Sequence, residues 1–126
     1  MHTDTVALLR SNYMASVISY SGGYGPWPGT MTAQDPSNHV SSIQTYGDAS
    51  DAVVINFPQA SKQYYTTFQP QGYYTMMCSH PGGHAIDTGV APKSLDFFMA
   101  HPFKVNPEPY ASAVPAGFPT YCKNAP

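Results

Sequence analysis

Acidic residues and histidines follow two expected strands at positions that suit a paired carboxylate and imidazole. Asp48 and Asp51 come directly after one expected strand, and His80 and His84 come after the next. Because the carboxyl ends of neighbouring parallel strands lie at one edge of a sheet, an Asp and a His placed there can meet. A carboxylate that orients an imidazole makes up two-thirds of a Ser-His-Asp triad. The pattern therefore predicts an acid–base pair at this edge.

Within each pair we favour one residue. Asp51 directly precedes Ala-Val-Val, where the loop turns back over the sheet edge, and His84 follows two glycines that let the backbone approach a neighbouring loop closely. The order Asp before His is that of the α/β-hydrolases. Asp48 and His80 remain the alternatives, and either Asp could instead be an ordinary turn residue that bonds its own loop.

A zinc site is the rival interpretation of the histidines. His80, His84 and Asp87 form an H-x3-H…D pattern of potential ligands. However, Pro81-Gly82-Gly83 would break the helix that usually places such ligands on one face. We therefore expect no metal site here.

No serine of this chain has the sequence context of an activated nucleophile. The motif G-x-S-x-G, which marks the sharp strand-to-helix turn of the nucleophile, does not occur in the 126 residues. Ser21 follows an expected strand, but it lacks the preceding Gly-x and enters a loop. A triad that includes Asp51 and His84 would need a serine from outside this chain.

Strands and helices are expected to alternate, which predicts an α/β fold with about three parallel strands and flanking helices. The expected helices cover residues 3–12, 56–69 and 91–101, and the expected strands cover 14–19, 40–46 and 73–79. The last helix carries Leu95, Phe98 and Met99 on one apolar face. An irregular loop over 22–39 and an irregular Pro-rich tail over 102–126 complete residues 1–126, which we treat as one partial domain.

Composition excludes several classes of protein. The chain has 5 Lys and Arg against 7 Asp and Glu, and charged residues make up 10% of it, compared with about 25% in ordinary soluble domains. So few basic residues argue against nucleic-acid binding. No run of 18 apolar residues that would predict a membrane span occurs.

The two cysteines, Cys78 and Cys122, are 44 positions apart and belong to no C-x-x-C pair. They are either buried thiols or one disulfide that ties the C-terminal tail to the body. Scarce charge and abundant tyrosine slightly favour the disulfide, which would place the protein in an oxidising compartment.

The stretch from Tyr46 to His84 resembles the secreted α/β-hydrolase family of poly(3-hydroxybutyrate) depolymerase-like and feruloyl-esterase-like enzymes. In that family the triad Asp lies in a Gly-containing turn, commonly followed by x-V-V, and the triad His ends a C-x-H-x-G-G-H type motif. Here these segments read Y-G-D-A-S-D-A-V-V and C-S-H-P-G-G-H. The resemblance therefore assigns the triad roles to Asp51 and His84 and puts Cys78 where the family often has a cysteine.

The rest of the resemblance is less specific. VALLRSNYMASVISYSGGY resembles the helix after the nucleophile elbow, the next strand and its S-G-G turn. The ending FPTYC resembles the tail of some members, which strengthens the Cys78–Cys122 disulfide. Tyr46 departs from the family, where many members have His. We expect Met1 to be an internal methionine just past the nucleophile, so that the elbow and the oxyanion-hole donors lie outside the chain.

The resemblance implies that the chain is the C-terminal portion of an α/β-hydrolase that cleaves small-molecule or polymeric esters without a cofactor. It implies an extracellular or periplasmic location for the parent protein. Tyr24 and Trp27 would lie near the pocket mouth and contact an aryl or polyester acyl chain. Alone, the chain is expected to be inactive and to self-associate through an exposed sheet edge. The alternative is a non-catalytic remnant that binds an aryl or polyester ligand.

Overall fold

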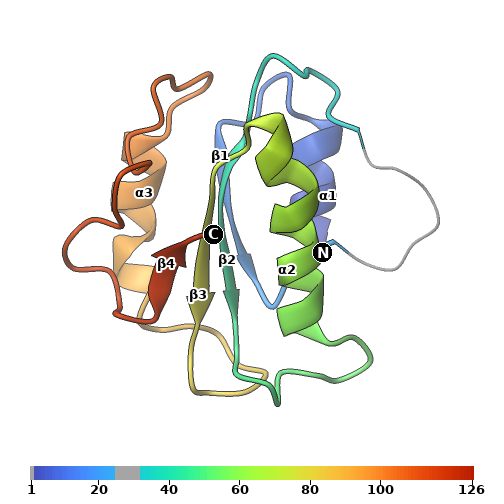
Figure 1. Cartoon of the computed structure of the whole chain (residues 1–126), viewed down its shortest axis with the longest axis vertical. Coiled ribbons are helices and arrows are strands. Elements are labelled where there is room, and N and C mark those ends of the chain that lie inside the picture. Colours follow the sequence, from blue (N-terminus) through green and yellow to red (C-terminus); the bar gives the residue numbers. More distant parts are fainter. Residues whose placement is uncertain (1, 25–31) are drawn as a thin grey trace.

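In a computed structural model that describes residues 2–24 and 32–126, a four-stranded sheet lies between two layers of helices (Figure 1). The helices α1 (His2–Leu9) and α2 (Phe57–Phe68) cover one face, and α3 (Ser94–Ala100) lies on the other. The strands are β1 (Ser16–Tyr20), β2 (Ser41–Tyr46), β3 (Thr75–Ser79) and β4 (Cys122–Asn124), in that spatial order. The first three are parallel, and β4 runs antiparallel to β3. The chain therefore has a mixed α/β fold, as predicted.

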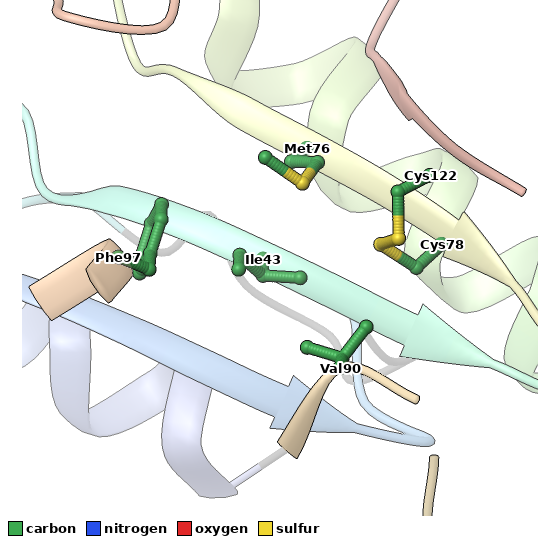
Figure 2. Close-up of a cluster of buried hydrophobic side chains, with 6 residues drawn as sticks. All are labelled: Ile43, Met76, Cys78, Val90, Phe97 and Cys122. Carbon is green, nitrogen blue, oxygen red and sulfur yellow. A yellow bond between two sulfur atoms is a disulfide. The ribbon is translucent and has the colours of Figure 1, made fainter. Parts of the chain in front are cut away.

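Strands β2 and β3 are the inner strands of the sheet, since each pairs with a neighbour on both sides. In the register, Ile43 lies beside Ile18 of β1 and beside Met76 of β3. Ile43 and Met76 are inaccessible to solvent and belong to a core cluster on the α3 side of the sheet. Figure 2 shows this cluster, whose buried members are Ile43, Met76, Cys78, Val90, Phe97 and Cys122.

Helix α2 forms where its local sequence predicts it. The Asn56 side chain caps its first turn by accepting a hydrogen bond from the Gln59 amide at 2.9 Å. Pro58 stands in the first turn, where the missing amide hydrogen costs nothing. Ala60, Tyr64 and Phe68 repeat every four residues and are buried against the sheet and α1.

The last helix presents a different face from the one its sequence suggested. A 3-10 turn (Ala91–Lys93) precedes α3, and within α3 only Phe97 is fully buried. Leu95 and Met99 are 68% and 76% exposed, and Phe98 is 43% exposed. The face that packs on the core instead carries Phe97 and, four residues on, the buried His101. Apolar spacing alone could not show which side of this short helix the sheet would cover.

The expectation of a wholly irregular tail over 102–126 is wrong at its end, where β4 forms. Cys122 pairs with Cys78 in the strand register, and the two sulfur atoms are joined in a disulfide. The Ala125 amide then donates to the Thr75 carbonyl at 2.9 Å. Three residues are too few to show a strand pattern in the sequence, so β4 owes its conformation to the backbone of β3 and to the disulfide.

At the other edge of the sheet, β1 has no strand on its outer side among the described residues. Such an edge presents free amide and carbonyl groups to a further strand. Self-association through this edge stays a prediction. Within the described ranges, no helix has the length and apolar character that crossing a membrane requires.

We expect the disulfide to contribute substantially to stability, because it closes a loop of 44 residues in the unfolded chain. Replacing both Cys78 and Cys122 with Ala should lower the free energy of unfolding by about 3–4 kcal/mol. Urea unfolding followed by circular dichroism measures this change. Wild-type protein unfolded in reducing buffer is the control and should lose a similar amount, whereas an unchanged midpoint in both samples would contradict the prediction.

A buried histidine, His101, joins α3 to the C-terminal tail through hydrogen-bonding contacts with Phe97 and Glu108. His101 is inaccessible to solvent, and its Nδ1 and Nε2 atoms lie 2.8 Å from the Phe97 carbonyl and 2.6 Å from the Glu108 carboxylate. Both ring nitrogens thus face acceptors, which an imidazolium ring satisfies by donating twice. Glu108 also accepts from the Ser41 hydroxyl and the Tyr110 amide.

These contacts lower the pKa of Glu108. Burial by itself would raise the pKa, but the hydrogen bonds from His101 and the Tyr110 amide, and the charge of His101, bring it below the usual 4.5. A carboxyl whose pKa is lower in the folded state stabilises the fold above its unfolded pKa, and this stabilisation is lost as the pH falls through the folded pKa.

The free energy of unfolding should therefore fall more steeply with acid in wild type than in Glu108→Gln. We expect the difference between the two proteins to shrink as the pH is lowered from about 5.5 to about 3. Urea unfolding at several pH values measures it. Asp96→Asn, on the exposed surface of α3, is the control. If the difference in the free energy of unfolding between wild type and Glu108→Gln stayed constant over this pH range, the ionisation of Glu108 would not contribute to the acid sensitivity of the fold.

Candidate functional site

Asp51 lies in the loop after β2 with its carboxylate completely shielded from solvent. Its Oδ1 atom is 2.8 Å from Nδ1 of His84. Its Oδ2 atom accepts hydrogen bonds from the Gly47 amide at 2.8 Å and the Ser21 hydroxyl at 3.0 Å. Three donors thus compensate for the loss of water around this carboxylate.

His84 is the exposed partner of the pair. Its side chain is 49% accessible, and the ring stacks on Phe57 with centroids 5.0 Å apart and planes 14° apart. Because Nδ1 faces a carboxylate, this nitrogen carries a hydrogen, and in the neutral ring Nε2 is then an acceptor. The ring lines a hollow of about 290 Å³ together with Tyr20, Ser21 and Ile86. The arrangement suits a base that takes a proton from a group in that hollow.

The structure brings together Asp51 and His84 and leaves the two alternatives apart from them. Asp48 is exposed and accepts from the amide and hydroxyl of Ser50, the local bonds of an ordinary turn residue. The hydrogen bond from the Ser50 hydroxyl has the larger effect on the pKa of Asp48, and it lowers this pKa together with the bond from the Ser50 amide. His80 is nearly buried, and its Nδ1 accepts from the Gly82 amide at 3.1 Å. The structure places Asp51 and His84 in direct contact, and their catalytic roles stay predictions.

Two glycines allow the loops after β2 and β3 to touch. A Cβ atom at Gly47 would overlap the backbone of Gly83, so the loops approach this closely only because Gly47 has no side chain. Gly83 has φ of 59°, in the left-handed region that favours glycine. The His80 amide also donates to the Tyr46 carbonyl at 2.9 Å. Backbone contacts therefore set the distance between the two loops that carry Asp51 and His84.

Ser21 belongs to the site, although its sequence context is not that of a nucleophile. It follows β1 directly, with φ of 46°, and its amide donates to the Thr45 carbonyl at 2.8 Å. Its hydroxyl is hydrogen-bonded to Asp51, not to His84. Ser21 is therefore a positioning residue. Its place after a strand, at the same edge as Asp51, was the signal available in the sequence.

Of the two aromatic residues expected at the pocket mouth, Tyr24 lies within the described residues and Trp27 does not. The ring of Tyr24 meets Phe68 edge-on at 5.9 Å, and its amide donates to the Ala60 carbonyl. Tyr24 also lines a hollow of about 210 Å³ beside Val54 that does not include His84. Trp27 lies outside the described residues. A ligand-binding role for both stays a prediction.

The residues of the rival zinc pattern have separate partners. His84 contacts Asp51, His80 bonds within its own turn, and Asp87 accepts from the Tyr121 hydroxyl at 2.6 Å and from two backbone amides. Across residues 2–24 and 32–126, no group of three or more His, Cys, Asp or Glu side chains is placed to hold a metal ion. The geometry gives the zinc interpretation no support.

Comparisons of this chain with protein-family models, with curated proteins and with solved structures found no match.

Substituting Gly47 with Ala should separate the two loops and disturb the Asp51–His84 hydrogen bond, because the new methyl group would overlap Gly83. We expect a destabilisation of about 1–3 kcal/mol and loss of the downfield imidazole proton signal of His84 in NMR spectra. Gly82→Ala is the matched control, since its Cβ would meet the His80 ring at 3.1 Å and the Ala85 methyl group at 4.0 Å but not the loop after β2. An unchanged His84 signal in Gly47→Ala would show that the loop contact does not position the pair.

Proposed function

We propose that this chain carries the Asp–His pair of a serine carboxylic ester hydrolase of the α/β-hydrolase type, with the nucleophile supplied from outside its 126 residues. The observation that carries the proposal is the 2.8 Å contact between Asp51 and His84, where a buried carboxylate holds a half-exposed imidazole. The pair lies in the loops that follow two neighbouring parallel strands, where α/β proteins commonly place their functional groups.

The geometry supports the roles that a base and an orienting carboxylate have in a Ser-His-Asp triad. A serine hydroxyl in the hollow beside His84 would attack the ester carbonyl while Nε2 of His84 accepts its proton. The same proton would then pass from Nε2 to the oxygen of the departing alcohol, and water would release the acid by the reverse sequence. Asp51 would keep the hydrogen on Nδ1 and stabilise the imidazolium that forms.

The motifs around the pair support a family as well as a reaction. The turn with Asp51 before Val53-Val54 and the C-S-H-P-G-G-H segment resemble secreted poly(3-hydroxybutyrate) depolymerase-like and feruloyl-esterase-like enzymes. The Cys78–Cys122 disulfide is compatible with an extracellular or periplasmic location. The substrate on this proposal is a small-molecule or polymeric ester.

The alternative is a non-catalytic module that binds an aryl or polyester ligand through the loop over 22–39. Tyr24 and its adjoining hollow are the described features that favour it. Saturable binding of such a ligand that is insensitive to Asp51→Asn and His84→Ala, without ester hydrolysis, would favour this alternative.

The decisive test begins with the reading frame upstream of the Met1 codon. We expect it to encode G-x-S-x-G within a few residues of Met1. The extended polypeptide should then hydrolyse p-nitrophenyl butyrate, and the 126-residue chain alone should not exceed free imidazole. In the extended polypeptide, His84→Ala and Asp51→Asn should each lower kcat by about a thousandfold or more, because each removes a triad member.

Asp48→Asn and His80→Ala are the matched controls, since they make the same changes in the same two loops without touching the pair. Both should retain most of the activity. An upstream frame without a serine elbow would refute the proposed source of the nucleophile. Full activity of His84→Ala would refute the assignment of the base.

A further inference from the structure

A large hollow in the described part of the molecule is lined by neither Asp51 nor His84. It measures about 840 Å³ and shares no lining residue with the hollow at His84. That size falls within the range typical of small-molecule sites, about 300–1,000 Å³. Its main contributors are one face of α2, the ends of β2 and β3, strand β4 and the residues flanking β4.

The sheet and helix α2 explain why a hollow forms here. In the strand register, Tyr46 lies beside Ser79, and Met77 lies beside Lys123. These two pairs form the floor, since paired residues share a face of the sheet. Lys62 and Tyr65 of α2 form one wall. Because β4 extends the sheet beyond the strands that α2 contacts, the space over Lys123 is left open.

The walls are mainly aromatic and apolar. Three tyrosines, Tyr46, Tyr65 and Tyr121, line the hollow together with Met77 and prolines. The Tyr121 hydroxyl donates to Asp87 at 2.6 Å, which holds this ring in place. Burial, followed by this hydrogen bond, raises the pKa of Tyr121 to about 12. Preset aromatic walls suit a flat apolar ligand.

Positive charge predominates among the residues that line the hollow. Lys62 and Lys123 line it, no Asp or Glu does, and its one carboxylate is the terminal group of Pro126. Two other lysines of the chain are paired, Lys93 with Asp96 at 2.9 Å and Lys104 with Asp35 at 3.4 Å. No ion pair links Lys62 or Lys123 to an acidic side chain in the described part of the chain. The two ammonium groups therefore outnumber the one carboxylate, and together with the apolar walls they are complementary to an amphipathic anion.

We propose that this hollow binds an organic carboxylate with a flat apolar body, the body against the tyrosines and Met77 and the carboxylate between Lys62 and Lys123. A strongly hydrated inorganic anion fits less well, because the lining is predominantly apolar. The site is independent of the proposed ester hydrolysis, since it shares no residue with the Asp51–His84 pair and needs no nucleophile.

The test is an NMR titration of the 126-residue chain with 2-naphthoate and with its neutral analogue 2-naphthamide. We expect saturable one-to-one binding of the carboxylate, with contacts from the naphthalene protons to the Met77 methyl group. The amide should bind about tenfold more weakly, because it lacks the charge. Lys62→Gln and Lys123→Gln should each weaken naphthoate binding about threefold to tenfold and leave naphthamide binding nearly unchanged.

Lys93→Gln is the matched control, since it removes a lysine outside the hollow, and it should bind naphthoate like wild type. Both hollow lysines are exposed, so their variants should fold normally. Equal affinities for naphthoate and naphthamide, insensitivity to both lysine substitutions, or contacts near His84 in place of Met77 would each overturn the proposal. None of these results depends on whether the chain takes part in ester hydrolysis.

Discussion

The buried carboxylate of Asp51 is the group on which the carboxyl edge of the sheet depends. A charge without water is costly unless donors surround it. The donors come from residues that follow three different strands: Ser21 after β1, Gly47 after β2 and His84 after β3. The parallel arrangement brings these three strand ends to one edge, and the carboxylate holds them together. The same bonds that satisfy Asp51 also orient the imidazole, so structural and chemical demands coincide at this position.

A second buried carboxylate plays a comparable part nearer the start of the chain. Asp4, in the first turn of α1, accepts from the Ser19 hydroxyl at 2.8 Å, the Gly23 amide at 2.9 Å and the Gln44 side chain at 2.6 Å. It thereby joins α1 to β1 and β2. A chain with few charged residues has thus placed three of its seven Asp and Glu side chains in the interior, Asp4, Asp51 and Asp87, and each accepts hydrogen bonds there. Polar contacts of this kind need one particular geometry, which favours a unique packing of the layers.

Strand β4 and the disulfide change the surface of the sheet beside β3, at the edge opposite β1. Without them, β3 would end the sheet and Met77 would lie at its margin. With them, Lys123 lies beside Met77, and Tyr121 lines the hollow together with residues of α2. The Cys78–Cys122 bond is buried in the core on the α3 face (Figure 2), so the covalent link is made on one face and the hollow opens on the other. A short tail segment therefore creates a binding surface that the three parallel strands alone would lack.

The sequence by itself determined those features that depend on short-range physics. The Asn56 cap and Pro58 in the first turn favour α2, and the order and context of Asp51 and His84 single out the residues that meet. Tertiary structure decided the rest, because it depends on which strand ends become neighbours and on strand register. Ser21 contacts Asp51 only after β1 and β2 pair, and Phe97 faces the core only because the sheet covers that side of α3. Spacing left Cys78 and Cys122 open between thiols and a disulfide, and register decided it by placing the two residues side by side across β3 and β4.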